Sequence, residues 1–166
     1  MTDLTDRLAL PLLATGQAQK ELTHNEAITR LSFATQASVV AIAPSTVPSA
    51  PSPGQCWVVG ASAAGAWAGK DAQLACWTAN GWRFIVPFDG FTVWSIADGK
   101  YASFTSFAWS VGIVEAVQVN VGGVQVVGAR QAAITSPSGG STIDAEARSA
   151  VTTILGALRT HGLIEA

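Results

Sequence analysis

The sequence predicts an α+β protein with an N-terminal helical arm, a central antiparallel β-meander and a C-terminal amphipathic helix. Two observations indicate the meander. Apolar and polar residues alternate from Gln73 to Val127, and two-residue turn signals recur along that stretch. These signals are Asn80-Gly81, Asp89-Gly90, Asp98-Gly99 and Gly122-Gly123. Such pairs between strand-forming residues favour hairpins, so we expect a barrel-like or sandwich-like sheet over residues 55–128.

The turn positions also predict which residues face each other, because a two-residue turn fixes the strand register. Around Asn80-Gly81 the expected pairing leaves one uniformly apolar face and one mixed face. The expected pairs are Trp77 with Phe84, Ala75 with Val86, Thr78 with Arg83 and Cys76 with Ile85 at the first turn, Ile96 with Tyr101 and Trp94 with Ser103 around Asp98-Gly99, and Val121 with Val124, Val119 with Val126 and Asn120 with Gln125 around Gly122-Gly123.

The N-terminal arm is expected to contain one helix. Thr23 and Glu26 have the spacing of a capping box, in which each side chain binds the other residue's backbone N–H. This pattern predicts a helix that begins there and ends near Ala37. The apolar positions at helical spacing are Ala27, Ile28, Leu31 and Ala34. An isolated helix of this length is marginal in water, so the stripe must dock on another surface.

A proline-rich segment over residues 43–54 follows the arm and holds four of the seven prolines. Such a composition is typical of a semi-rigid extended connector. We therefore divide the chain into an anchor arm at 1–42, a linker at 43–54, a β domain at 55–128 and a C-terminal region at 129–166.

The C-terminal region predicts a second helix. Asp144 can cap its start, and Gly162 can end it, with Leu163 and Ile164 folding back as a hydrophobic latch. The apolar stripe proposed for oligomerisation consists of Val151, Ile154, Leu155 and Leu158. Two arrangements remain open: the stripe packs on the chain's own sheet, or the same helix from several subunits forms a short bundle.

The composition favours a protein that associates with copies of itself. Hydrophobic residues make up 49% and charged residues 12% of the 166 residues, which leaves few charges to solvate a monomer. The alternative is a small domain rich in Ala. A net charge of -2 and a pI near 5.5 argue against nucleic-acid binding. No signal peptide or membrane-spanning stretch is expected, so synthesis should take place in the cytoplasm.

Catalytic and metal-binding patterns are not expected. His24 and His161 stand far apart, and Cys56 and Cys76 are expected to be free core thiols rather than a disulfide. Asp89 and Asp98 could form a glycosidase pair, but both occupy the first position of a turn, where Asp is favoured for backbone reasons. We therefore expect a non-enzymatic protein without a cofactor.

Six tryptophans are the remaining chemical signal. Indole rings fill cores, and they also form stacking platforms for sugar rings. In an all-β region the core role is the default. Trp67, in a loop of small residues, is the candidate for a surface glycan contact.

Several segments together resemble one family. They are Gln17-Ala18-Gln19-Lys20, Thr23-His24-Asn25-Glu26-Ala27, Gly65-Ala66-Trp67-Ala68-Gly69, Ala75-Cys76-Trp77 and Gly81-Trp82, with Val127 to Ile134, Gly139-Gly140, Asp144 to Arg148 and Leu158 to Ile164 in the tail. The chain resembles the DUF2793 family of phage and prophage proteins, including those of gene transfer agents. The resemblance covers nearly the whole chain.

The resemblance implies a structural component of a phage-like particle, most simply a head-spike base or fibre-attachment subunit. The expected partners are copies of the chain, as a trimer or pentamer, together with capsid and fibre proteins. The anchoring residues would be Gln17, Gln19, Lys20, His24, Asn25 and Glu26. The alternative is a carbohydrate-binding module that contacts host polysaccharide through exposed tryptophan.

Overall fold

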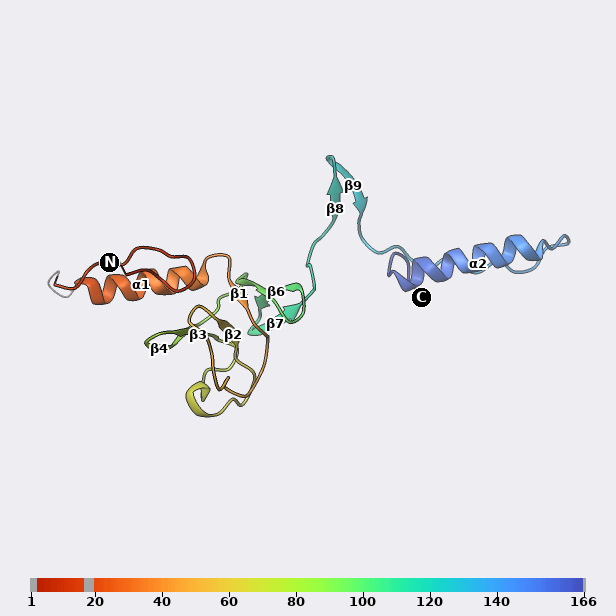
Figure 1. Cartoon of the computed structure of the whole chain (residues 1–166). Helices are drawn as coiled ribbons and strands as arrows, with labels where there is room; N and C mark the ends of the chain where they lie inside the picture. The colour runs from red at the N-terminus through yellow and green to blue at the C-terminus, as the bar shows by residue number, and fades with distance from the viewer. Residues whose placement is uncertain (1–2, 17–19, 166) are drawn as a thin grey trace. The chain divides into compact units, whose positions relative to one another are not determined.

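The structure is a computed structural model that describes residues 3–16 and 20–165 (Figure 1). The chain divides into two compact units, Met1–Ile113 and Val114–Ala166, called here the N-terminal and C-terminal units. The N-terminal unit holds α1 (Lys20–Ala34), β1 (Ser38–Val39), β2 (Cys56–Val58), the 3-10 turn η1 (Gly65–Trp67), β3 (Leu74–Thr78), β4 (Gly81–Ile85), β5 (Thr92–Ser95), β6 (Lys100–Thr105) and β7 (Ala108–Val111). The C-terminal unit holds β8 (Val119–Val121), β9 (Val124–Val127) and α2 (Ala145–Thr160).

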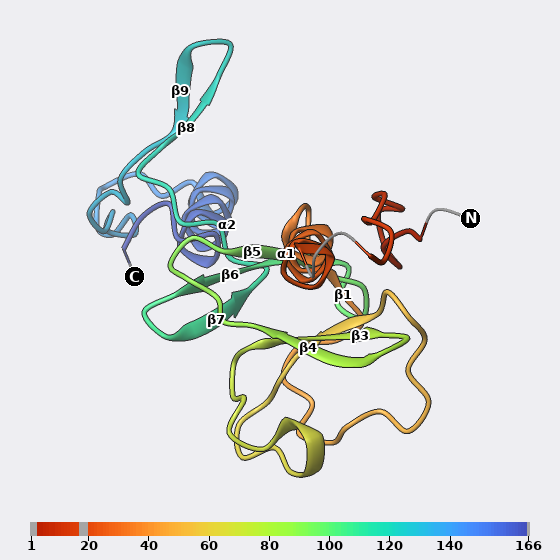
Figure 2. The same ribbon diagram turned by 90° about the vertical axis from the view of Figure 1, so that its left-hand side faces the viewer.

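The strands form three separate sheets, which confirms the α+β class but gives no closed barrel. In the N-terminal unit one sheet has the order β1-β5-β6-β7 and the other the order β2-β3-β4, and Figure 2 shows their ribbons as distinct layers. β8 and β9 pair with each other in the C-terminal unit. All pairings are antiparallel except β1 with β5, which is parallel.

The three-stranded sheet is buried on both faces. Successive residues of a strand point to opposite faces, so Leu74 and Cys76 of β3 enter one hydrophobic core, and Ala75 and Trp77 enter another. The first core lies between this sheet, α1 and the four-stranded sheet; its members include Phe33, Ala37, Val39, Cys56, Val58, Phe91, Val93, Ala102 and Phe104. The second, called here the tryptophan core, includes Trp57, Val59, Ala63 and Trp67, with Trp77, Trp82 and Phe84 packed against it.

The N-terminal arm and the sheets share the first core. Phe33, near the end of α1, is 1% exposed, and Val39 of β1 is fully buried. The proline-rich segment also packs closely: Gly60 N–H donates to the Pro44 carbonyl, and Val47 contacts the tryptophan core. Residues 1–42 therefore cannot be removed without opening the hydrophobic core of the sheets.

The start and the packing face of α1 differ from the sequence prediction. Thr23 lies inside the helix and is exposed, so the capping box expected from Thr23 and Glu26 is wrong. The buried residues of the helix are Ser32 and Phe33, whereas Leu31 is 54% exposed. The helix contacts the core at its C-terminal end, where Ala34 is the member of the predicted stripe that packs against the first core.

The β3–β4 hairpin keeps the predicted faces but has a different register. Trp77 faces Trp82 and Ala75 faces Phe84, because the pairing begins at Thr78 and Gly81. A type I′ turn needs positive φ at both central residues, and here only Gly81 has it, with φ +99°. This is the signature of a type I turn followed by a glycine bulge. The Thr78 hydroxyl accepts from Asn80 N–H and donates to the Gly81 carbonyl, which stabilises the turn.

The other three predicted turns differ in how well the observed pairing agrees with the prediction. Trp94 faces Tyr101 rather than Ser103, because a four-residue loop joins Ser95 to Lys100. Asp89-Gly90 is a turn between the two sheets and not a hairpin. The pairs Val121 with Val124 and Asn120 with Gln125 are confirmed, but a register shift places Val119 opposite Val127 instead of Val126.

α2 has the predicted ends. The Asp144 carboxylate caps the helix by accepting from Ala147 N–H at 2.8 Å. At the other end Gly162 has φ +71°, and Leu163 N–H donates to the Leu158 carbonyl as in a Schellman motif. Ile164 then forms a β-bridge with Gln131 and is 4% exposed. Ile164 therefore folds back as predicted, whereas Leu163, the other residue of the predicted latch, is 42% exposed.

Candidate attachment and assembly surfaces

The N-terminal segment is fastened to the C-terminal end of α1 by Arg7. The last carbonyls of a helix lack partners inside the helix and carry partial negative charge. The Arg7 guanidinium donates to the carbonyls of Ser32 at 2.9 Å and Thr35 at 2.6 Å, and also to that of Gln36. Arg7 thus neutralises the helix end from a residue that precedes the helix in sequence.

Two of the predicted anchoring residues make contacts within the chain. The Asn25 side chain binds Leu13 on both sides, accepting from its N–H at 2.9 Å and donating to its carbonyl at 3.0 Å. Glu26 accepts from Arg30 one turn along α1 and from Arg83 on β4 at 2.7 Å. Both side chains therefore hold the N-terminal unit together.

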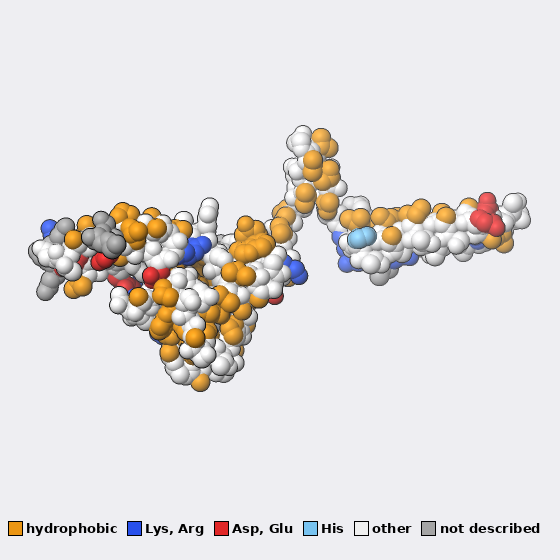
Figure 3. Space-filling model, viewed as in Figure 1, with side chains coloured by type: hydrophobic (Ala, Val, Ile, Leu, Met, Phe, Trp, Pro, Cys, Tyr) orange, Lys and Arg blue, Asp and Glu red, His pale blue; other side chains and the backbone are white. Residues whose placement is uncertain are grey.

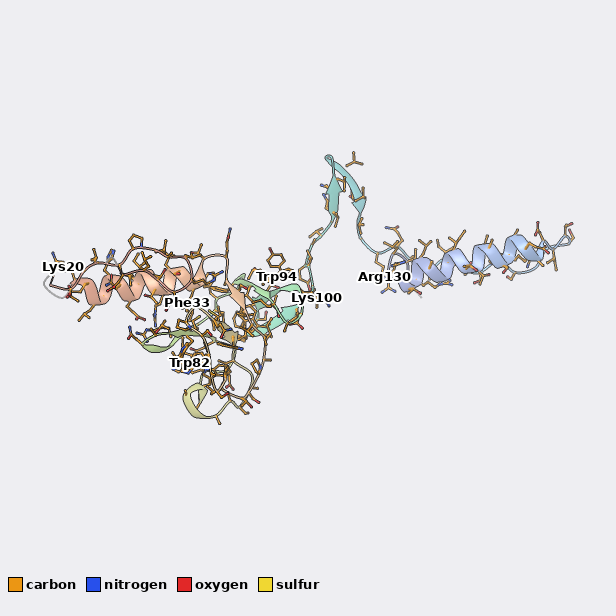
Figure 4. The ribbon with its side chains drawn as sticks, in the orientation of Figure 1. Lys20, Phe33, Trp82, Trp94, Lys100 and Arg130 are labelled. Carbon is orange, nitrogen blue, oxygen red and sulfur yellow. The ribbon has the colours of Figure 1, made fainter. Side chains whose placement is uncertain are left out.

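The remaining predicted anchoring residues lie elsewhere. Lys20 and His24 are exposed, one turn apart at the start of α1, and Lys20 is labelled in Figure 4. Gln17 and Gln19 lie outside the described residues. Of the four that the structure describes, Lys20 and His24 are the ones with exposed side chains that make no hydrogen bond or ion pair within the chain's described part, and both are accessible to a partner.

Trp67 is enclosed in the tryptophan core, so the prediction of a surface glycan contact at this residue is wrong. Its side chain is fully buried. Its ring lies 6.2 Å from that of Trp57 and 5.2 Å from that of Trp82, centroid to centroid; Trp82 is labelled in Figure 4. The 3-10 turn η1 folds Trp67 inward, which the small residues around it in sequence did not indicate.

Trp94 is the most exposed of the six tryptophans, all of which lie in the described part of the chain. It is 38% exposed and packs edge-to-face against Tyr101, which is 66% exposed, at 4.9 Å between ring centroids. Lys100 precedes Tyr101 on β6 and is also exposed; Trp94 and Lys100 come from neighbouring strands in Figure 4. We call Trp94, Lys100 and Tyr101 the basic aromatic patch.

A pocket of about 650 Å³ opens near the other end of β6. Its walls include Phe88 and Phe107, which are 68% and 92% exposed, and the carboxylates of Asp71 and Asp89. Sequence reasoning missed this pocket because its lining comes from three separated segments; exposed aromatic side chains at turns were the available signal. We call these four residues the acidic aromatic pocket.

The turn beside this pocket is strained. Ser106 and Phe107 form the two-residue loop between β6 and β7, and both have positive φ, +52° and +64°. Asn and Gly are the residues that suit such a turn, whereas a bulky side chain there is a true outlier. The Asp89 carboxylate accepts from Ser106 N–H at 3.1 Å and helps to hold the loop.

The C-terminal unit leaves most of its apolar side chains exposed. In the predicted oligomerisation stripe Val151 and Ile154 are 42% and 58% exposed, Leu158 is half-buried and Leu155 is buried. The hairpin adds further exposed residues: Val119, Val121, Val124, Val126 and Val127. Figure 3 shows hydrophobic side chains gathered on this hairpin and along α2. A two-stranded ribbon is marginally stable alone, so the unit presents an incomplete core.

The two cysteines face each other across β2 and β3 as buried, free thiols. The side-chain hydrogen bond with Cys56, which favours the protonated form, and burial both raise the pKa of the Cys76 thiol. Asp89 and Asp98 each stabilise a turn. Asp89 accepts from Ser106 N–H, and Asp98 accepts from the Ser95 hydroxyl. Within residues 3–16 and 20–165, no cluster of three or more His, Cys, Asp or Glu side chains could hold a metal ion, and no helix is long and apolar enough to cross a membrane.

These features define a small α+β domain with two hydrophobic cores, followed by a unit with little core of its own. The family model described as protein of unknown function (DUF2793) matches residues 24–110, so the chain belongs to the DUF2793 family. The matched span runs from α1 through most of β7 and ends before the C-terminal unit, so the resemblance noted in the tail lies outside it. No curated protein matches the chain.

Proposed function

We propose that this chain is a non-enzymatic structural component of a phage-like particle, such as a gene transfer agent or prophage particle. In this role it forms a head-spike base or fibre-attachment subunit that links the capsid to a host-binding fibre. It is made in the bacterial cytoplasm, associates as a trimer or pentamer, and becomes part of the particle.

The observation that carries this proposal is the amount of exposed apolar surface. Large hydrophobic side chains are exposed in both units, from Leu22 and Leu31 on α1 to Ile154 on α2. Contiguous patches of this kind mark interaction sites, and the low charged fraction of the chain adds few solvating groups. Assembly into a larger structure covers such surfaces.

Attachment to the capsid is assigned to the exposed start of α1. Lys20 and His24 offer a cation and an imidazole on one helix face, and Asn25 and Glu26 support that surface through their contacts with Leu13 and Arg83. The C-terminal unit, with its uncovered stripe and hairpin, is assigned to subunit association and to the fibre.

The test is co-purification with particles. The bacterium that encodes the chain is induced, nuclease-resistant particles are banded on a density gradient, and the chain is measured by mass spectrometry. We expect the chain in the particle band at a fixed ratio to the capsid protein, and we expect Lys20→Glu with His24→Glu to reduce that ratio. Ser45→Glu with Thr46→Glu, in an exposed loop, is the matched control. A chain that stays in the soluble fraction contradicts the proposal.

A carbohydrate-binding role is the second candidate, and Trp94 is the observation that favours it. An exposed indole beside a tyrosine can stack on a sugar ring. Titration with host polysaccharide should then change tryptophan fluorescence in the wild type and not in Trp94→Ala. The absence of any change in the wild type removes this candidate.

A further inference from the structure

We propose that the basic aromatic patch of one copy docks into the acidic aromatic pocket of the next copy, which joins the subunits head to tail. This inference rests on the proposed assembly function and names the surfaces that perform it in the N-terminal unit. It is independent of the α2 stripe, because none of its residues lies in the C-terminal unit.

The two surfaces have complementary charge. Asp71 and Asp89 line the pocket, and neither has an ion-pair partner among the described residues. Lys100 in the patch likewise has no carboxylate partner in the part of the chain that the structure describes. An ion pair between copies would supply the missing counter-charge and fix the register of docking.

The two surfaces are also both aromatic. The pocket of about 650 Å³ is flanked by Phe88 and Phe107, and Tyr101 is a projecting ring that is 66% exposed. Aromatic anchors of this kind, seated in an apolar pocket, dominate many interfaces. The tyrosine hydroxyl can meet a pocket carboxylate while its ring packs between the phenylalanines.

The placement of the surfaces on β6 permits two kinds of assembly. Lys100 and Tyr101 begin the strand, and Phe104, near its end, lines the pocket. In a two-fold dimer each patch meets the partner's pocket, so the contact forms twice; in a heterologous arrangement the contact passes from copy to copy and closes into a ring when the rotation permits. The trimer or pentamer of the proposed function is the heterologous ring, and the mass of the assembly distinguishes it from the dimer.

The strained turn supports a functional role for the pocket. Phe107 combines φ +64° with a side chain that is 92% exposed. Its backbone is therefore strained, and its side chain adds no buried surface that would stabilise the fold. Strained residues of this kind cluster at binding sites. The proposal explains Phe107 as a wall of the docking pocket.

The experiment measures association by sedimentation velocity, with thermal unfolding as a check on folding. Lys100→Glu and Asp89→Lys should each weaken association at least about tenfold, and the double variant should recover most of it because the charges are exchanged. Asp6→Lys, an exposed charge reversal in the N-terminal unit outside both docking surfaces, is the matched control. Asp89→Asn keeps the acceptor for Ser106 N–H and removes only the charge, so it should weaken association without unfolding the turn.

Phe107→Asn separates docking from folding. Asn suits positive φ, so this variant should unfold at a higher temperature than the wild type and yet associate less strongly. The proposal is overturned if Phe107→Asn or the single charge reversals leave association unchanged, or if the double variant is no better than either single one. In those cases the particle test above still decides the proposed function separately. A monomeric wild type whose Trp94 fluorescence responds to polysaccharide also overturns the docking proposal.

Discussion

Glu26 on α1 and Arg83 on β4 form a hydrogen-bonded ion pair across 57 residues of sequence, with 2.7 Å between Arg83 Nε and Glu26 Oε2. The same carboxylate also binds Arg30, one turn along the helix, at 3.1 Å. The two arginine side chains differ in exposure, 29% for Arg83 and 57% for Arg30. The helix is therefore bound to the three-stranded sheet by a partly buried pair and carries an exposed pair beside it.

This geometry predicts unequal coupling energies for the two pairs. In double-mutant cycles on the free energy of unfolding, measured with urea, Glu26 and Arg83 should couple by about 1 kcal/mol. Glu26 and Arg30 should couple by about 0.3 kcal/mol, because exposed pairs on one helix are screened by water. Glu26→Gln, Arg83→Met and Arg30→Met provide the cycles. Equal coupling energies would mean that the pair between α1 and β4 stabilises the fold no more than the exposed pair within α1.

The packing face of α1 predicts losses of different size for two nearby residues. Phe33→Ala should reduce the free energy of unfolding by about 3–5 kcal/mol, because Phe33 is 1% exposed in the first core. Leu31→Ala, at a side chain that is 54% exposed, should reduce it by less than about 1 kcal/mol. Denaturant titration of both variants measures the difference. A larger loss for Leu31→Ala would restore the predicted stripe as the buried face.

Arg7 predicts a local effect at the end of α1. Arg7→Met removes the donors to the carbonyls of Ser32 and Thr35, and it should reduce the free energy of unfolding by about 1–2 kcal/mol. Amide hydrogen exchange in the last turn of α1 should rise more than in its first turns. Arg7→Lys should recover only part of the loss, because an ammonium lacks the fork of donors. Full recovery by lysine would show that charge alone acts.

The cysteine pair predicts how stability changes at high pH. The side-chain hydrogen bond with Cys56 and burial raise the pKa of Cys76 in the folded state above its ordinary value near 9. Above that pH the unfolded chain releases the thiol proton and the folded chain retains it, so the folded state binds more protons and stability falls. The loss from this group approaches about 1.4 kcal/mol per pH unit.

The control for that prediction is Cys76→Ala, compared with the wild type between pH 8 and pH 10. The variant loses stability at all pH values through the cavity it creates, but its slope against pH should be shallower. Identical slopes would show that the Cys76 thiol ionises as readily in the folded chain as in the unfolded one.

Local signals in the sequence predicted the elements better than their contacts. Asp144 and Gly162 marked the ends of α2 correctly, because helix caps depend on residues within one turn. The alternation around Asn80-Gly81 placed the correct residues on each face, although the glycine bulge moved the register. Thr23 and Glu26 matched a capping box by spacing alone, whereas the helix already includes both residues.

The contacts that were missed join residues that are distant in sequence. β1 has only two residues, Ser38 and Val39, so it shows no alternation, and its parallel pairing with β5 could not be predicted. The pair of Glu26 with Arg83 and the burial of Trp67 depend on how separate segments pack. The pocket beside Phe107 could not be predicted either, because no sequence pattern indicates that Ser106 and Phe107 adopt positive φ.

We propose that this chain functions as an assembled subunit, and the absolute mass of the purified full chain tests this proposal. The mass is measured by light scattering after size exclusion, over a range of concentrations. As the proposal requires, we expect a stable mass of three or five times the 17.1 kDa of one chain. A mass of one chain at every concentration would contradict it, because the exposed apolar surfaces would then have no copy to cover them.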